Sequence, residues 1–146
     1  DLTKKLKISK NKYKNILVLN VLEHLPTYDL AFSEINRILK KGGYLIGSVP
    51  FLYQVHGAPN DYFRFTKDSL NYNLINNKFK NIKIIPLGYG PFVASSSLIH
   101  PYIKFIPFFS QIILLIACIL DSFIQIFVKT KLNEIFPIGY FFIAKK

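Results

Sequence analysis

A strand, a helix and a second strand follow one another in this sequence with only short joints between them. Residues 15–20 (NILVLN) form a short apolar run without alternation, which is typical of a strand buried on both faces in a parallel sheet. In residues 29–43 (DLAFSEINRILKKGG), apolar side chains recur at helical spacing, and charged residues such as Glu34 and Arg37 lie on the opposite side. Residues 44–49 (YLIGSV) give the second strand. A crossover of this kind joins parallel neighbours, so the sequence predicts an α/β fold.

The ends of the predicted helix carry capping residues. Thr27 or Asp29 can cap its start, and lysines occupy its last turn. Gly42 and Gly43 supply a left-handed stop at its end. Because these glycines end a helix rather than begin one, we do not interpret them as a phosphate-binding loop.

Four further segments complete the predicted domain. Residues 50–66 form a long loop rich in aromatic side chains, and loops of this length in compact domains are usually functional or disordered. Thr66 is the predicted N-cap of a helix over residues 67–77. Residues 81–87 (NIKIIPL) predict a third strand, and residues 137–145 predict a terminal strand.

Residues 91–131 differ from the rest of the chain in composition. The stretch 105–120 carries no charge, but its 16 residues are fewer than the roughly 20 that a bilayer-spanning helix needs. The polar residues of this region fall close together on a helical wheel: Gln111, Cys118, Ser122, Gln125 and Lys129. A narrow polar stripe beside a wide apolar face is typical of a helix in a membrane interface or against a partner. A spanning helix with Asp121 near its end and burial inside the domain are the alternatives.

The chain is basic, with 19 Lys and Arg against 8 Asp and Glu and a net charge of +11. Much of the excess lies in one run near the start: Lys4, Lys5, Lys7, Lys10, Lys12 and Lys14. Such a run can attract phosphates or anionic lipid headgroups, or it can be a solvated loop. The charge is not interleaved with the aromatic loop, so it does not favour a nucleic-acid-binding groove.

The cysteine, histidine and methionine content bears on disulfides, metal binding and chain processing. A single cysteine allows no disulfide within the chain, which favours a reducing, cytoplasmic compartment. His24, His56 and His100 stand far apart in sequence without ligand-like spacing, so the sequence predicts no metal site. The chain has no methionine, from which we expect a fragment or a processed chain.

Four short motifs occur in order along the chain. They are residues 20–25 (NVLEHL), 34–43 (EINRILKKGG), 48–51 (SVPF) and 59–66 (PNDYFRFT). Their order, spacing and placement on the predicted elements resemble the second half of the class I S-adenosylmethionine-dependent methyltransferases, close to the type 11 group. The resemblance covers residues 1 to about 90 and the last strand.

This resemblance implies the C-terminal part of a Rossmann-like sheet, with parallel strands and a final antiparallel strand. Residues 1–90 and 132–146 would form a partial methyltransferase domain. Residues 91–131 would form a hydrophobic helical insertion that faces a membrane or a partner. The glycine-rich loop of the family and its ribose-binding acidic residue have no counterpart in this chain, so we expect methylation only from a longer protein and no activity from these 146 residues alone.

The resemblance assigns cofactor contacts to two places. Ligands of open α/β sheets bind outside the carboxyl ends of the strands. In the family, the segment after the first of these strands lines the methionine end of S-adenosylmethionine and the acceptor pocket, a role that falls to Asn20 and Leu22. Asp1 and Leu2 resemble the acidic turn whose carboxylate accepts a hydrogen bond from the adenine amine. The alternative is that Asp1 is a frayed terminus.

Catalytic and substrate-binding candidates lie on the turn and the long loop. His24 can act as a general base, because an imidazole titrates near neutral pH, or it can orient the turn that follows. The loop residues His56, Asp61, Tyr62 and Arg64 match a family loop that closes over substrate. Asp61 and Arg64 can instead pair with each other and hold the loop's shape.

Two functions from different classes follow. The first is methyl transfer from S-adenosylmethionine to a small or lipid-linked acceptor. The protein would be cytoplasmic and peripheral on the inner face of the membrane, which residues 98–131 would contact. A homodimer is left open. The second is a non-catalytic, membrane-associated interaction module on a methyltransferase scaffold. A nucleic-acid methyltransferase rests only on the net charge.

Overall fold

The computed structural model describes residues 1–57 and 60–146, so Pro59 of the PNDYFRFT motif lies outside the described residues. The chain forms two compact units. Unit 1 comprises Asp1–Pro50, Val55–Ile85 and Tyr140–Lys146, and unit 2 comprises Phe51–Gln54 and Pro86–Gly139. The division predicted from sequence, a partial domain of residues 1–90 and 132–146 with an insertion at 91–131, stays a prediction.

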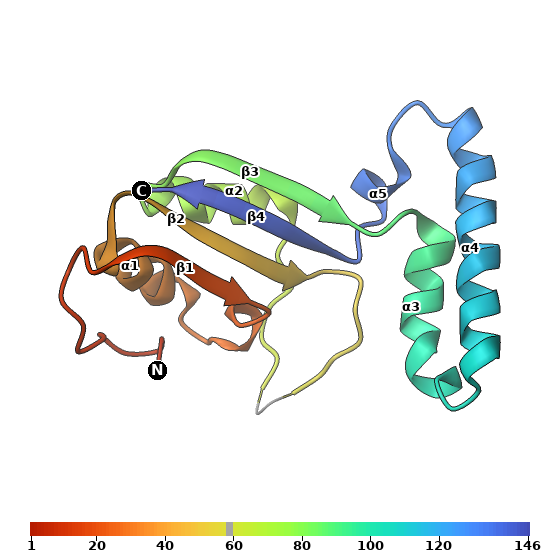
Figure 1. Ribbon diagram of the computed structural model, residues 1–146, viewed down its shortest axis with the longest axis horizontal. Helices are drawn as coiled ribbons and strands as arrows, with labels where there is room; N and C mark the ends of the chain where they lie inside the picture. The colour runs from red at the N-terminus through yellow and green to blue at the C-terminus, as the bar shows by residue number, and fades with distance from the viewer. Residues whose placement is uncertain (58–59) are drawn as a thin grey trace. The chain divides into compact units, whose positions relative to one another are not determined.

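A four-stranded sheet with strand order β1-β2-β4-β3 is the centre of unit 1. The strands are β1 (Tyr13–Leu19), β2 (Leu39–Pro50), β3 (Lys80–Leu87) and β4 (Gly139–Lys145). β1 and β2 pair in parallel, and β4 runs opposite to the other three strands (Figure 1). The predicted fold class, a mainly parallel sheet with a final antiparallel strand, is confirmed.

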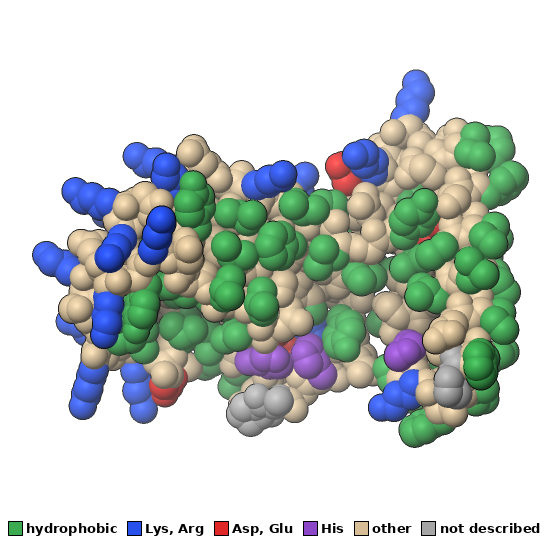
Figure 2. Space-filling view, viewed as in Figure 1, with side chains coloured by type: hydrophobic (Ala, Val, Ile, Leu, Met, Phe, Trp, Pro, Cys, Tyr) green, Lys and Arg blue, Asp and Glu red, His purple; other side chains and the backbone are tan. Residues whose placement is uncertain are grey.

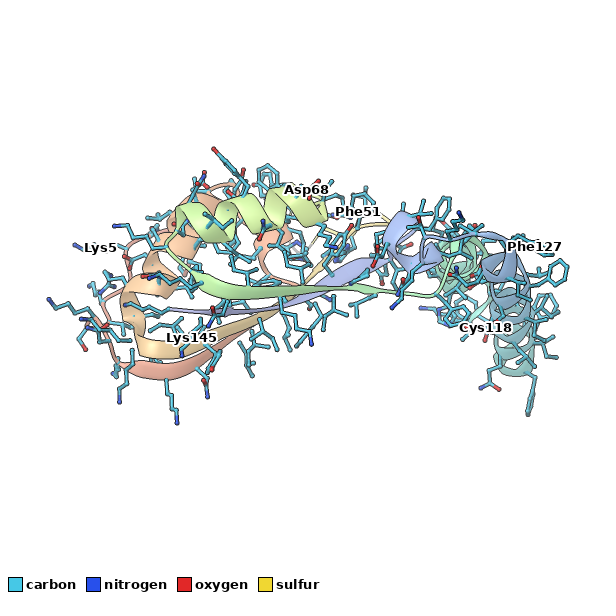
Figure 3. All side chains as sticks on the ribbon, turned by 90° about the horizontal axis from the view of Figure 1, so that it is seen from above. Lys5, Phe51, Asp68, Cys118, Phe127 and Lys145 are labelled. Carbon is cyan, nitrogen blue, oxygen red and sulfur yellow. The ribbon has the colours of Figure 1, made fainter. Side chains whose placement is uncertain are left out.

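Two helices, α1 (Tyr28–Ile38) and α2 (Lys67–Asn76), lie on the same side of this sheet (Figure 3). The side chain of Thr66 accepts a hydrogen bond from the amide of Ser69 over 3.1 Å, which confirms the predicted N-cap of α2. The core lies between the helices and the sheet. Its fully buried apolar side chains include Phe32, Leu45, Leu70, Leu74 and Phe142.

The predicted end of α1 is wrong. The helix ends at Ile38, and Gly42 and Gly43 belong to β2. The register between β1 and β2 shifts at this point, and Gly42 has φ of +74°. A Cβ on Gly43 would lie 2.4 Å from the carbonyl oxygen of Lys14, so the glycine permits a close approach of two strands. Pairing with β1 therefore overrides the local helical pattern.

The burial of β1 on both faces was also a wrong expectation. Val18 is 3% exposed on the side of the helices, whereas Leu17 is 66% and Leu19 54% exposed on the other side. Within the described part of unit 1, both helices cover the same face, and the second face of the sheet stays apolar and open.

Glu34 and Arg37 do not form the solvated side of α1 that the helical wheel suggested. The Glu34 carboxylate accepts hydrogen bonds from Arg37 Nε and from the Leu6 amide, both over 2.7 Å, and Arg37 donates to the Ile8 carbonyl oxygen over 2.7 Å. Glu34 is 5% exposed. The hydrogen bond from Arg37 lowers the pKa of Glu34 to about 2. This ion pair therefore ties the N-terminal segment to α1.

Unit 2 contains α3 (Pro91–Ile103), α4 (Pro107–Phe127) and the short α5 (Leu132–Ile135). The buried carboxylate of Asp121 on α4 accepts hydrogen bonds from the amides of Phe92 and Val93, over 3.0 and 2.9 Å. These are the first free N–H groups of α3, so Asp121 caps one helix from the other. Most of residues 91–131 is thus helical, but α4 ends at Phe127, so Lys129 of the predicted polar stripe lies beyond it. The role of this segment as an insertion stays a prediction.

Candidate functional site

The carboxyl ends of β1 and β2 meet through Asn20 and Ser48. The Asn20 amide donates to the Ser48 carbonyl oxygen over 2.9 Å, and the Ser48 hydroxyl donates to Asn20 Oδ1 over 2.8 Å. Asn20 has φ of +50°, a left-handed conformation that asparagine tolerates better than most residues. This turn leaves the Asn20 side chain exposed at the edge where open α/β sheets bind ligands.

A single 3-10 turn, η1 (Leu22–His24), follows directly. The side chains of Leu22 and Glu23 are fully buried, and that of His24 is 18% exposed. Of the two predicted cofactor contacts here, the Asn20 side chain is therefore accessible, whereas Leu22 contributes its side chain to the core.

The long loop is bound to η1 by main-chain hydrogen bonds. The carbonyl oxygen of Glu23 accepts from the amides of Tyr62 and Phe63, over 2.8 and 3.3 Å. Nδ1 of His24 lies 2.6 Å from the carbonyl oxygen of Asn60. Because a carbonyl oxygen can only accept, Nδ1 carries the proton in this arrangement. His24 thus holds the long loop against η1, while its two predicted roles, as a general base or in orienting the turn that follows it, stay predictions.

Asp61 is the central group of the loop. Its side chain is 2% exposed and forms a two-pronged ion pair with Arg64, in which Arg64 Nη2 lies 2.6 Å from Oδ2. The same oxygen accepts from the main-chain amide of His56 over 3.0 Å and lies 3.3 Å from its Nδ1. The hydrogen bond from Arg64 holds the pKa of Asp61 well below its usual range. The structural pairing considered from sequence is thus present.

His24 and His56 meet across this loop. Their rings are edge to face with centroids 5.1 Å apart, and Figure 2 shows histidine side chains gathered at this surface. Nε2 of His24 lies 3.7 Å from Oε1 of Glu23. Among the described residues, neither carboxylate oxygen of Glu23 has a hydrogen-bond partner, and burial raises the pKa of this side chain.

Sequence reasoning missed this cluster. The two histidines are 32 positions apart, and no spacing rule relates them. The available signal was indirect: each follows a predicted strand whose carboxyl end lies at the same edge of a parallel sheet. From sequence, Glu23 could position a backbone amide or the cofactor, but its burial was not predictable, since a glutamate is usually solvated.

Asp1 and Tyr62, two further residues predicted from sequence, are both exposed. Asp1 is exposed, and its Oδ1 accepts from the amide and the hydroxyl of Thr3, over 3.0 and 2.7 Å. This small turn gives the terminus a defined shape. Tyr62 is 46% exposed and its ring lies 6.2 Å, between centroids, from that of the half-buried Phe63, so it can meet a ligand.

Comparisons with known proteins show which fold this chain shares. The family described as "Methyltransferase domain" matches residues 1–47. A SAM-dependent methyltransferase from Archaeoglobus fulgidus superposes on 95% of the chain with a TM-score of 0.59 at 15% identity. The family model covers less than half of the chain, and the structural likeness concerns the fold. No protein of curated function matches its sequence.

Two further structures show the range of this fold. A phosphoethanolamine N-methyltransferase from Haemonchus contortus, in complex with phosphomonomethylethanolamine and S-adenosylhomocysteine, matches 96% of the chain at 17% identity and a TM-score of 0.55. The (4+2)-cyclase SpnF matches all of it at 14% identity and a TM-score of 0.57. The chain spans 62%, 53% and 35% of the lengths of the Archaeoglobus protein, the cyclase and the Haemonchus enzyme. At these identities the likeness concerns the fold.

Proposed function

We propose that this methyltransferase-type chain is part of an enzyme that transfers a methyl group from S-adenosylmethionine to a small or lipid-linked acceptor. The observation that carries the proposal is the turn at the ends of β1 and β2, where Asn20 is exposed and held by Ser48. It lies where α/β sheets bind ligands, in a fold shared with methyltransferases.

The donor set at this edge fits one end of the cofactor. S-adenosylmethionine, when bound, supplies the methyl group on a sulfonium sulfur. Its methionine end carries an amino and a carboxylate group, which the amide of Asn20 and the hydroxyl of Ser48 can pair with. The Asp1 carboxylate can accept from the adenine amine, and Leu2 can pack beside the ring. Methyl transfer then depends mainly on placing the acceptor in line with the sulfonium carbon.

The loop supplies the acceptor side of the proposed site. Tyr62 and His56 have accessible side chains, while Asp61 and Arg64 fix the loop that carries them. His24 holds the same loop through Nδ1, so a role as general base would use Nε2.

The open face of the sheet supports the view that activity needs more of the domain than this chain contains. Leu17 and Leu19 expose apolar surface on β1, and the chain spans 62% of the Archaeoglobus methyltransferase. We expect calorimetry with S-adenosylmethionine to show binding by a protein extended upstream, and weak or no binding by residues 1–146 alone. An extended protein with an intact glycine-rich loop that binds no cofactor would contradict the enzyme proposal.

Membrane contact through unit 2 is the finer part of the proposal. The segment Phe108–Phe127 is long and apolar enough to cross a membrane, with mean hydropathy 2.0 and 11% of it buried. Hydrophobic side chains gather over α4, among them Phe108, Ile126 and Phe127 at 80%, 76% and 74% exposure (Figure 2). An apolar face of this kind favours a helix lying in a membrane interface.

Flotation with anionic liposomes tests this contact. The triple variant Phe108→Ser, Ile126→Ser, Phe127→Ser should lose most of the bound fraction. The matched control replaces three exposed apolar residues of unit 1, Leu17, Tyr72 and Ile75, by serine. Equal flotation of both variants and the unmodified chain would remove the membrane part and leave methyl transfer untouched.

The second candidate is a non-catalytic, membrane-associated module on the same scaffold. The exposed apolar face of α4 favours it, since that face serves association whether or not the site is active. Membrane binding without S-adenosylmethionine binding by the extended protein would select this candidate.

A further inference from the structure

Glu23, His24 and His56 form a cluster in unit 1 whose ligand-type atoms all lie within 4.8 Å of one another. We propose that this cluster binds a divalent transition-metal ion, with Zn²⁺ as the best fit, through the Glu23 carboxylate, Nε2 of His24 and a ring nitrogen of His56. The inference goes beyond methyl transfer and does not depend on it. Two imidazoles and one carboxylate are the ligand set of several catalytic zinc sites.

The first support is the state of Glu23. Its side chain is fully buried, and within the described structure its two oxygens have no hydrogen-bond partner. A buried carboxylate without partners is costly unless a cation or donors compensate it. A metal ion bound beside it would supply that compensation, because the carboxylate would become a ligand.

The second support is the tautomer of His24. Nδ1–H donates a hydrogen bond to the Asn60 carbonyl oxygen, 2.6 Å away, so the lone pair resides on Nε2. Nε2 is also the nitrogen that lies 3.7 Å from Glu23 Oε1. Metal-binding histidines usually donate their other ring N–H to a carbonyl or a carboxylate, which fixes the ring and raises its basicity.

The third support is the setting of His56. Oδ2 of Asp61 lies 3.3 Å from its Nδ1, the place of the carboxylate in carboxylate–histidine–metal arrangements. Arg64 in turn fixes the position of the Asp61 carboxylate through a two-pronged ion pair. The His56 side chain is 33% exposed, so an ion can enter from solvent and keep a water in its remaining position.

The geometry requires only a small contraction. Zinc holds nitrogen and oxygen ligands at about 2.0–2.2 Å, which in a tetrahedral site separates two ligand atoms by about 3.3 Å. The Glu23–His24 separation of 3.7 Å is close to that value already, and the cluster as a whole spans 4.8 Å. Side-chain rotation of His56 towards the other two ligands completes the site.

Direct metal titration of the 146-residue chain tests the proposal. After treatment with a chelator, we expect Zn²⁺ to bind with one ion per chain by calorimetry, and Co²⁺ to give visible d–d absorption of a low-coordinate site. The variants Glu23→Gln and His56→Gln should each lose more affinity than Asp61→Asn, which only removes the carboxylate beside His56 and should lose about 10- to 100-fold. His100→Gln, an exposed histidine of unit 2, is the matched control and should bind as the unmodified chain does.

Two outcomes would overturn the proposal. One is the absence of Zn²⁺ heat and Co²⁺ absorption from the folded, unmodified chain. The other is equal affinity in Glu23→Gln, His56→Gln and His100→Gln, which would indicate adventitious surface binding. Thermal unfolding without metal checks that each variant is folded, and Glu23→Gln keeps the shape of the side chain. No S-adenosylmethionine is used, so a failure here is distinct from a failure of the enzyme proposal.

Discussion

Replacement of Glu34 by glutamine should make the stability of the protein less sensitive to acid. The Glu34 carboxylate accepts hydrogen bonds from Arg37 and from the Leu6 amide, and its pKa falls from 4.5 to about 2. A carboxyl group with a lower pKa in the folded state stabilises the fold above its unfolded pKa. That stabilisation decreases as the pH falls from about 5 towards 2.

The size of the effect follows from the same shift. Lowering the pKa from 4.5 to about 2 corresponds to at most about 3.4 kcal/mol of the free energy of unfolding at neutral pH. Arg37 is 28% exposed, so solvent screens part of this interaction, and we expect about 1–2 kcal/mol. At about pH 2.5 most of that contribution is lost from the unmodified chain.

Urea unfolding of both proteins at neutral pH and at about pH 2.5 measures this difference. Glu34→Gln should be less stable by about 1–2 kcal/mol at neutral pH and nearly equal to the unmodified chain in acid. Glu134→Gln, at an exposed position, is the control and should change little at either pH. A stability difference that stays the same at both pH values would refute the reasoning, since it would show that the charge of Glu34 contributes nothing.

Three further substitutions test the contacts that shape the two units. Asp121→Ala removes the acceptor of two amides at the start of α3 and should cost about 2–4 kcal/mol, with faster hydrogen exchange of those amides. Gly43→Ala places a Cβ against the Lys14 carbonyl oxygen and should cost about 1–3 kcal/mol in urea unfolding. Arg64→Lys keeps the charge but loses the two-pronged pair with Asp61, so about 1–2 kcal/mol of stability should be lost and protease cleavage in the loop should rise.

Elements whose signals are local were predictable from the sequence. The apolar runs of β1 and β3 and the cap at Thr66 depend on neighbours within a few residues, and the structure has them where expected. The end of α1 depends on a distant strand. Helical spacing continues through Leu39, but pairing of this residue with Tyr13 on β1 turns the chain into β2. Propensity and pattern describe a segment alone, and tertiary pairing overrides them.

The candidate site shows the same limit. Asn20 could be placed at a sheet edge from the strand that precedes it, but its bond to Ser48 depends on the register of two strands. The burial of Glu34 was hidden because the segment that covers it, around Leu6, has no pattern of its own. The meeting of His24 and His56 required the path of a long loop, which no periodicity encodes.

The reaction of this site has to be argued from its residues, because the (4+2)-cyclase with the same fold shows that the scaffold does not fix the chemistry. Nε2 of His24 determines whether this residue can act as a base or as a metal ligand. The bond from Nδ1 to Asn60 leaves one lone pair on the ring, and that pair can take a proton or bind a metal ion, not both. If an ion were bound there, His24 would act as a ligand rather than as a general base, and the ion would supply a positive charge that lowers the pKa of a bound oxygen. If His24 is a metal ligand, the variant His24→Gln should lose metal binding and activity together. If His24 acts only as a base, the same variant should lose activity while its metal affinity stays unchanged.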